Sequence, residues 1–207
     1  ALEATQCRLS GGIGFVEMDE ASYIELDSPV DWEIVESLLT ARSRSTKVPV
    51  GHGKAIRFVA TDVDGCLTDS GMYYGEQGDE LKKFNTRDGK AFELLRDAGI
   101  LTGIITAENT QLVERRAAKM GVDELHQGAK DKVAVMQEIL DRTGIGWDEV
   151  AYLGDDLGDV ALLQKVAMAA CPADAVREAL AVCTYCLRSK GGEGALREFV
   201  ELILQSR

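Results

Sequence analysis

The alternation of apolar strands with amphipathic helices is the feature that most restricts what this chain can fold into. From Ala55 onward, apolar periodicity predicts four strands, at 56–61, 100–106, 150–153 and 167–170. Helices are predicted at 89–98, 110–120, 132–142 and 194–205, with a short one after Asp156. Repeated strand–helix units form a parallel sheet with helices on both faces. The predicted fold is therefore an α/β, doubly wound parallel sheet of the Rossmann-like kind.

One segment interrupts this order directly after the first predicted strand. Residues 72–74 and 81–84 are extended arms around the Gly-containing turn 75–79, which predicts a β-hairpin. Ligands bind such sheets at the carboxyl ends of the strands, where the strand order reverses. We therefore expect the hairpin to be a flap beside the site.

The first 54 residues are organised differently. Residues 43–54 are polar, contain Pro and Gly and have no apolar period, which is typical of a linker. Before them, Ser28 and Pro29 predict the start of a helix from about Val30 to Arg42, because Ser is a good N-cap and Pro fits the first turn. We therefore expect a small remnant of another domain at 1–42, a linker at 43–54 and a main domain at 55–207.

Charge and cysteine content argue against several classes of function. The net charge of -12 at pH 7 argues against nucleic-acid or anionic-membrane partners, which require a basic surface. The five cysteines include one close pair, Cys183 and Cys186, without the second pair of a zinc site. We expect reduced thiols on a late strand, with a redox pair as the alternative, and neither a membrane span nor a signal peptide. These expectations favour a cytoplasmic protein.

Two acidic clusters follow predicted strands. Asp62 and Asp64 end the first strand, and Asp155, Asp156 and Asp159 follow the strand at 150–153. Like charges held close together are costly without a cation, and Mg²⁺ prefers carboxylate and phosphate oxygens. An Asp-rich turn or a helix N-cap explains single aspartates in these clusters. The clustering as a whole favours a magnesium site.

Thr106 and Lys132 are two further candidates. Thr106 ends the predicted strand at 100–106, and Thr110 begins the next helix, so donors are expected where a phosphate could bind. Lys132 lies in the first turn of a helix, where a cation opposes the helix dipole unless an anion is nearby. Taken alone, an ordinary Thr at a strand end and a solvated Lys remain the alternatives.

In chain order, these residues resemble the motifs of the haloacid dehalogenase superfamily of phosphotransferases. The resemblance covers Ala55 to about Gln205 and implies that superfamily's fold, here without a cap domain because no segment is long enough to form one. It also implies a Mg²⁺-dependent phosphoric monoester hydrolase. The residues that carry it are Asp62, Asp64, Thr106, Lys132, Asp155, Asp156 and Asp159.

The resemblance also implies a role for each motif residue. Asp62 would attack phosphorus, and Asp64 would protonate the leaving oxygen and then activate water. Thr106 and Lys132 would hold the phosphoryl oxygens. The Mg²⁺ ligands would be Asp62, Asp155 and the main-chain carbonyl of Asp64, with Asp159 and Asp156 in support.

Within the superfamily, the chain is similar to capless phosphatases that act on keto-sugar acid phosphates. Residues 64–69, 84–89 and 190–198 carry this likeness. It implies a homotetramer in which flap and tail of adjacent subunits complete each site. It further implies that Arg87, Lys83 and Arg197 bind the substrate carboxylate and phosphate. The alternative is that these three cations are solvated or pair with Glu80, Asp88 and Glu198.

Residues 18–32 resemble the end of a sialic-acid (N-acylneuraminate) cytidylyltransferase. This implies the C-terminal part of a bifunctional protein and favours a nonulosonate 9-phosphate as substrate, without CMP transfer by this chain. The triplet Arg87-Asp88-Gly89 instead favours 3-deoxy-manno-octulosonate 8-phosphate. Both substrates stay open.

Two other functions compete with catalysis. A non-catalytic tetramerisation module of a CMP-sialic acid synthetase is one, and the retained acidic motif residues argue against it. A receiver domain of two-component signalling is the other. Its acidic pair precedes the phosphorylated Asp, whereas a second acidic cluster comes late in this chain.

Overall fold

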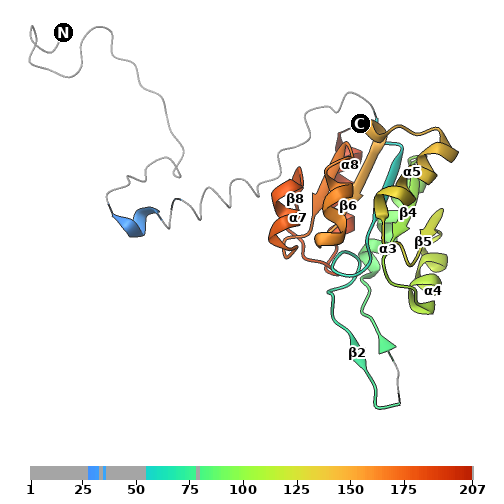
Figure 1. The fold of residues 1–207 in the computed structure, drawn as a ribbon, viewed down its shortest axis with the longest axis horizontal. Coiled ribbons are helices and arrows are strands. Elements are labelled where there is room, and N and C mark those ends of the chain that lie inside the picture. Colours follow the sequence, from blue (N-terminus) through green and yellow to red (C-terminus); the bar gives the residue numbers. More distant parts are fainter. Residues whose placement is uncertain (1–27, 33–34, 36–54, 78–79, 207) are drawn as a thin grey trace, which may run out of the picture. The chain divides into compact units, whose positions relative to one another are not determined.

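The computed structural model describes residues 28–32, 35, 55–77 and 80–206 (Figure 1). Residues 28–35 belong to a first unit, residues 1–43, and those from Ala55 onward belong to a second, residues 44–207.

In the first unit, the predicted helix start at Ser28 is confirmed. The Ser28 backbone N–H and hydroxyl both donate to Asp31 Oδ2 at 2.7 Å, and the Asp31 N–H donates to Ser28 Oγ at 3.3 Å. This reciprocal pair satisfies N–H groups that the first helical turn leaves without intrahelical partners. The rest of the helix expected up to Arg42 lies outside the described residues, apart from the helical Val35. The domain boundaries stay a prediction.

The second unit is built on a six-stranded sheet, and all of its strand pairs are parallel. In chain order the strands are β1 (Phe58–Thr61), β4 (Leu101–Ile105), β5 (Glu124–His126), β6 (Val150–Leu153), β7 (Met168–Cys171) and β8 (Tyr185–Cys186). Their spatial order is β5-β4-β1-β6-β7-β8. The chain leaves β1 toward β4 and β5 and then returns to the other side of β1 with β6. The predicted doubly wound fold is confirmed, and its strand order reverses between β1 and β6.

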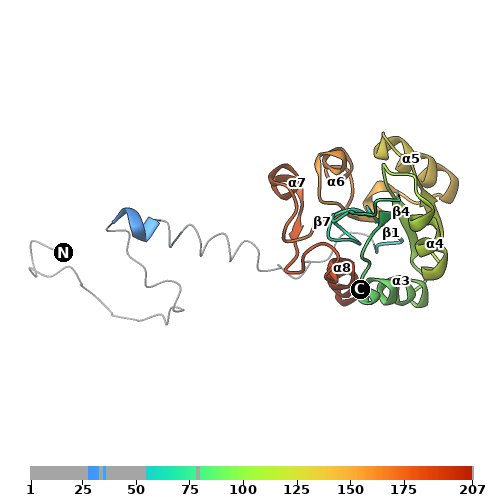
Figure 2. The same cartoon turned by 90° about the horizontal axis from the view of Figure 1, so that it is seen from below.

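Helices cover both faces of this sheet, as Figure 2 shows. One layer contains α3 (Thr86–Asp97), α4 (Gln111–Met120) and α8 (Ala195–Gln205), and the other contains α5 (Lys132–Thr143), α6 (Val160–Leu163) and α7 (Arg177–Val182). Successive side chains of a strand point to opposite faces, so Val59 packs in the first core while Phe58 and Ala60 pack in the second. No helix among the described residues is long and apolar enough to cross a bilayer.

Several elements differ from their predicted bounds. Helix α3 begins at Thr86 rather than at Gly89, because the Asn85 side chain accepts the Arg87 N–H at 2.9 Å and caps the helix three residues earlier. Helix α7 was not predicted. Of the two cysteines expected on a late strand, only Cys186 lies in a strand, β8, because Cys183 is the C-cap of α7. The short helix expected after Asp156 is the 3₁₀ turn η3 (Leu157–Asp159), which continues into α6.

The predicted hairpin is present. Strands β2 (Tyr73–Tyr74) and β3 (Glu80–Leu81) pair antiparallel and project from the body of the second unit (Figure 1). Between Ala107 and Asp131 the chain forms only α4 and β5, so these residues contain no cap domain. The hairpin, here called the flap, is the main projection near the strand ends.

Candidate active site

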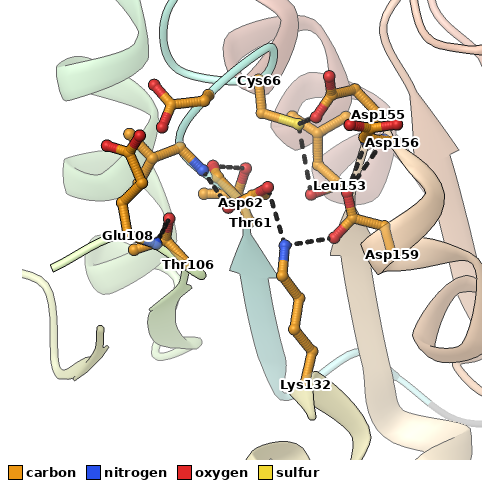
Figure 3. A network of polar contacts seen from close by, with 12 residues as sticks. Thr61, Asp62, Cys66, Thr106, Glu108, Lys132, Leu153, Asp155, Asp156 and Asp159 are labelled. Carbon is orange, nitrogen blue, oxygen red and sulfur yellow. Dashed lines mark hydrogen bonds and ion pairs between the residues drawn. The ribbon is translucent and has the colours of Figure 1, made fainter. Parts of the chain in front are cut away.

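The acidic clusters meet at the point where the strand order reverses. Thr61 and Leu153 are register partners at the ends of β1 and β6, and the Asp62 N–H donates to the Leu153 carbonyl at 3.0 Å. Oxygens from the carboxyl groups of Asp62, Asp155 and Asp159 lie within 4.8 Å of one another. Figure 3 shows these side chains facing one another across the two strand ends. The expected convergence of the two clusters is therefore present.

A glycine makes this convergence sterically feasible. Gly65 has φ +80°, a left-handed conformation that other residues rarely adopt. A Cβ atom at this position would lie 1.8 Å from Asp155 Oδ2. The turn after Asp62 therefore requires glycine both for its backbone and for the space that the Asp155 carboxyl group occupies.

Lys132 supplies the positive charge of the cluster. It opens α5, where Asp131 caps the helix by accepting the Ala134 N–H at 3.0 Å. The Lys132 Nζ lies 2.8 Å from Asp62 Oδ2 and 2.7 Å from Asp159 Oδ1, and its side chain is only 5% exposed. Burial alone would lower the pKa of Lys132, but the two carboxylates outweigh it and raise that pKa. Asp62 and Asp159 are thus the nearby anions that were expected for a lysine in the first turn of a helix.

Asp159 is fully buried, and protein donors occupy both of its oxygens. Lys132 and the Tyr152 hydroxyl donate to Oδ1 at 2.7 and 2.6 Å, and the N–H groups of Asp155 and Asp156 donate to Oδ2 at 3.0 and 3.2 Å. A carboxylate accepts about four hydrogen bonds. Asp159 therefore suits a supporting role better than direct metal ligation. Asp156 is exposed, and its side chain accepts the Leu157 N–H to cap η3.

Tyr152 is a buried member of this network that sequence reasoning missed. It lies in β6, and burial beside Asp159 and Asp62 raises its pKa well above the ordinary value, so the hydroxyl stays protonated as a donor. The available signal was one hydroxyl-bearing side chain in an otherwise apolar strand that leads into an acidic cluster.

The charge balance of the cluster fits a divalent cation. Burial and the neighbouring carboxylates raise the pKa of Asp155 to about 7. Burial raises the pKa of Asp62 to about 6, with Asp159 adding to the effect and Lys132 opposing it. When all three carboxyl groups are ionised, one ammonium leaves two negative charges uncompensated. Hard oxygen donors with this excess charge suit Mg²⁺.

Thr106 lies at the same edge, directly after β4, and is 2% exposed. Its N–H donates to the His126 carbonyl at 2.9 Å, which holds it beside β5. Its Oγ1 accepts the Glu108 N–H at 3.4 Å, so the hydroxyl hydrogen can turn toward the site (Figure 3). Thr110 caps α4 by accepting the Val113 N–H at 3.3 Å.

Asp64 points to a different cation from the one that binds Asp62. The Lys82 Nζ lies 2.9 and 2.8 Å from its two oxygens, and the Thr68 hydroxyl donates to Oδ1 at 3.2 Å. Lys82 also pairs with Glu108. Burial would lower the pKa of Lys82, but its bonds to Asp64 and Glu108 raise it overall. This second lysine cluster, Asp64, Lys82 and Glu108, was not predicted.

Comparison with known proteins identifies the family. The family described as haloacid dehalogenase-like hydrolase matches residues 105–199. The 3-deoxy-D-manno-octulosonate 8-phosphate phosphatase of Escherichia coli strain K12 is 36% identical over 168 residues, which are 81% of this chain and 89% of that relative. The chain belongs to the haloacid dehalogenase superfamily.

Solved structures from this superfamily agree with the fold. The 3-deoxy-D-manno-octulosonate 8-phosphate phosphatase of Yersinia pestis matches with a TM-score of 0.71 and 40% identity. The match covers 73% of this chain and 82% of the Yersinia pestis chain. The Moraxella catarrhalis 3-deoxy-D-manno-octulosonate 8-phosphate phosphatase, solved with magnesium ion, phosphate ion and KDO, matches with a TM-score of 0.72 and 34% identity. This match covers 73% of the present chain and 88% of the Moraxella catarrhalis chain. The predictions of a phosphoric monoester hydrolase and of a Mg²⁺ cofactor are thereby confirmed.

In this haloacid dehalogenase chain, Lys83 lies apart from the acidic residues. Its side chain is 57% exposed and pairs with Asp69 at 2.9 Å. From the end of β3 onward, successive side chains point to opposite sides, so the exposed Leu81 and Lys83 flank a Lys82 side chain that is 0% exposed. Of these two adjacent lysines, Lys82 contacts Asp64 and Lys83 contacts Asp69. Substrate binding by Lys83 stays a prediction.

Arg87 and Arg197 lie together at the starts of α3 and α8, in a surface pocket that also contains Ser189, Glu193, Gly194, Glu198 and Glu201. None of these lining residues belongs to the acidic cluster. Arg197 Nε pairs with Glu201 at 2.7 Å, and Glu198 accepts the N–H groups of residues 188 and 189 instead. Substrate binding by the two arginines stays a prediction.

Asp88 binds the start of α8 beside this pocket. It is buried, its Oδ1 accepts the Arg197 N–H at 3.0 Å, and burial raises its pKa to about 6. It thus caps α8, whose N-cap residue, Gly194, has no side chain. Just before α8, the Gly192 N–H donates to the Cys66 carbonyl at 3.0 Å, and a Cβ at Gly191 would lie 2.0 Å from the Gly65 oxygen. The segment before α8 therefore packs directly on the loop that follows Asp62.

Proposed function

We propose that this chain hydrolyses a keto-sugar acid phosphate through an aspartyl phosphate on Asp62, with 3-deoxy-D-manno-octulosonate 8-phosphate as the first substrate to test. The observation that carries the proposal is the placement of Asp62. Asp62 directly follows β1 at the reversal point of the sheet, and its Oδ2 lies 2.8 Å from the Lys132 ammonium, beside Asp155. The printed function of the relatives supports this substrate class.

The residues of the site suit a dianionic substrate. Asp62 is a poor nucleophile toward a phosphate dianion unless nearby cations cancel the repulsion. Lys132 provides one such cation. When bound, Mg²⁺ would be held by Asp62, Asp155 and the main-chain carbonyl of Asp64 and would neutralise charge on the phosphoryl oxygens. The Thr106 hydroxyl would donate to a phosphoryl oxygen.

In the first step, an Asp62 oxygen attacks phosphorus and the bond from phosphorus to the bridging oxygen breaks. The bridging oxygen takes the electron pair and receives a proton from Asp64, so the sugar acid leaves as an alcohol. The Val63 N–H, which donates to Asp62 Oδ1 at 2.7 Å, and Lys132 on Oδ2 fix the orientation of the nucleophile.

In the second step, water attacks phosphorus of the aspartyl phosphate and gives a proton to Asp64. The bond from phosphorus to Asp62 breaks, its electron pair returns to the carboxylate, and phosphate leaves. Asp64 then carries a proton again, so the cycle closes. General acid–base catalysis of this kind contributes about 10²- to 10⁴-fold in rate.

The test is phosphate release by the purified chain with Mg²⁺, using 3-deoxy-D-manno-octulosonate 8-phosphate and a panel of other sugar phosphates. The wild type should be active and Asp62→Asn inactive, with trapped ³²P on the wild-type chain after acid quench. If both proteins are inert on the whole panel, the non-catalytic tetramerisation role replaces this proposal.

A nonulosonate 9-phosphate is the second candidate substrate. The cytidylyltransferase-like pattern at residues 18–32, which ends in the Ser28–Asp31 cap, favours it. In this version, residues 1–42 are the end of a cytidylyltransferase-like domain and 43–54 are a linker to the phosphatase. The ratio of kcat/KM for the two phosphates decides between them, and a ratio above about 100 in either direction corresponds to about 2.7 kcal/mol of transition-state discrimination.

We also propose a homotetramer, in which neighbouring subunits cover the flap. Tyr73, Tyr74 and Leu81 of the flap are 57%, 72% and 61% exposed, and large exposed apolar side chains grouped together mark interaction surfaces. Sedimentation equilibrium of the wild type and of Tyr74→Glu tests this. A wild type that stays monomeric at micromolar concentration contradicts the tetramer.

A further inference from the structure

Lys82 is a buried cation that the proposed reaction does not yet use. Its side chain is 0% exposed although it follows β3 on the flap. It lies at the junction of three separate segments, because Asp64 comes from the loop after β1 and Glu108 from the loop after β4. A buried ammonium needs its hydrogen bonds satisfied, and here two carboxylates satisfy them.

The hydrogen bonds of Lys82 leave it no capacity for substrate. An ammonium has three protons. Lys82 makes two contacts with Asp64, at 2.9 and 2.8 Å, and a third with Glu108. A phosphate or carboxylate of the substrate would have to displace one of these partners. The geometry therefore argues against Lys82 as a direct binding residue.

The same hydrogen bonds fix the Asp64 carboxyl group in one orientation. Oδ1 accepts from Lys82 and from the Thr68 hydroxyl, whereas Oδ2 accepts from Lys82 alone among the described residues. Oδ2 thus keeps a lone pair for another partner. The side chain of Asp64 is 28% exposed, so that partner can arrive from solvent.

We propose that Lys82 is a positioning residue, which holds Asp64 so that Oδ2 exchanges protons with the bridging oxygen and then with the attacking water. This inference rests on the proposed function, because it concerns the proton transfers of that reaction. Glu108 in turn holds Lys82. Since Lys82 belongs to the flap, the position of the flap and the orientation of Asp64 are mechanically linked.

The two steps of the reaction separate this role from a structural one. With p-nitrophenyl phosphate, the leaving nitrophenolate is weakly basic and needs no proton, so formation of the aspartyl phosphate does not depend on Asp64. Hydrolysis of the aspartyl phosphate still needs Asp64 as a base. With a sugar phosphate, both steps need proton transfer.

The experiment is stopped-flow and steady-state kinetics of the wild type, Lys82→Met and Lys82→Gln with p-nitrophenyl phosphate and 3-deoxy-D-manno-octulosonate 8-phosphate. With p-nitrophenyl phosphate, we expect both variants to release about one equivalent of nitrophenolate per chain at a rate within about twofold of the wild type. The following steady-state rate should fall about 10- to 100-fold. With the sugar phosphate, the first turnover should fall by a similar factor.

A double-mutant comparison with Asp64→Asn completes the test. If Lys82 acts through Asp64, adding Lys82→Met to Asp64→Asn should slow the reaction by no more than about twofold further. Lys90→Met is the matched control, since Lys90 is an exposed lysine of α3 that pairs with Glu93. It should retain wild-type rates in both phases.

Three results overturn the inference. A raised KM with unchanged kcat makes Lys82 a substrate-binding residue. Equal loss of burst amplitude and steady-state rate makes it structural, because the amplitude counts correctly folded sites. Additive losses with Asp64→Asn make it independent of Asp64. An inert wild type is a separate outcome that overturns the proposed function itself and this inference with it.

Discussion

Two buried lysines lie at the carboxyl edge of the same sheet, and each binds two carboxyl groups. Lys132 comes from the core helix α5 and pairs with Asp62 and Asp159, whose side chains are 13% and 0% exposed. Lys82 comes from the flap and pairs with Asp64 and Glu108, which are 28% and 42% exposed. The carboxyl groups of the first cluster are therefore more deeply buried than those of the second. In the proposed reaction these similar ion pairs serve different purposes, because the first fixes the nucleophile Asp62 and the second holds Asp64, which exchanges protons with solvent and substrate.

The largest expected difference between the clusters is in folding stability. Lys132→Met leaves two buried carboxyl groups without their cation, which should lower the free energy of unfolding by about 3 to 5 kcal/mol. Lys82→Met leaves carboxyl groups that water can reach, so its loss should be about 1 kcal/mol. Urea unfolding at pH 7.5 without Mg²⁺ measures both. Equal losses would mean that solvent access does not distinguish the two clusters.

A buried carboxyl group without a lysine gives a reference for both clusters. The folded-state pKa of Asp88 is about 6, above the ordinary 3.8. Between these values the folded state binds more protons than the unfolded state, so this group makes stability fall as pH rises toward 6 and stay level above it. The cost at pH 7 is about 3 kcal/mol.

Asp88→Asn should remove that slope. The stability difference between Asp88→Asn and the wild type should shift in favour of the variant by up to about 3 kcal/mol between pH 4 and pH 7, measured by urea unfolding at each pH. A difference that does not change with pH would show that the carboxyl group titrates normally in the folded chain.

Magnesium should stabilise only the cluster around Lys132. At a hundredfold excess of Mg²⁺ over its Kd, a single site raises the free energy of unfolding by about 2.7 kcal/mol. We expect this rise in thermal denaturation of the wild type and of Lys82→Met. It should be absent in Asp155→Asn, and its persistence there would contradict ligation by Asp155.

The contribution of Tyr152 should be smaller. Tyr152→Phe removes the donor to Asp159 Oδ1 at 2.6 Å while keeping the ring in the core. Loss of a hydrogen bond to a buried carboxylate should cost about 1 to 3 kcal/mol. Urea unfolding measures it, and an unchanged midpoint would mean that Lys132 and the two N–H groups suffice for Asp159.

The smallest expected effect is at the surface pair of Lys83 with Asp69. Lys83→Met should leave the urea midpoint at its wild-type value, because exposed ion pairs contribute little. A clear shift would show that exposure is a poor guide to the importance of a lysine on the flap. The comparison with Lys82→Met, one residue away, isolates the effect of burial.

The features that the sequence predicted well are residues placed at the ends of strands or at the start of a helix. The ends of β1 and β6 are predictable from apolar periodicity, and the doubly wound order brings these ends together. The proximity of Asp62 and Asp155 could therefore be predicted from the sequence. Lys132 was recognisable because a cation in the first turn of a helix opposes the helix dipole unless an anion lies nearby. These inferences needed only local pattern and fold class.

The residues that were missed depend on contacts between distant segments. Whether Lys82 or Lys83 turns inward is decided by the register of the two-residue strand β3, which periodicity over so few residues does not reveal. Glu108 matters only because Lys82 reaches it, and Tyr152 only because Asp159 lies above it. The early start of α3 depended on a single capping side chain, that of Asn85.

The contact of the segment before α8 with the loop after Asp62 has a consequence for biosynthesis. Gly191 and Gly192 touch Gly65, Cys66 and Thr68, whose loop contains the proposed acid–base residue. A nascent chain that has emerged from the ribosome only as far as β8 lacks this support, although every acidic motif residue has already been made. The loop after Asp62 should therefore gain its native support only once residues 191 and 192 have been synthesised.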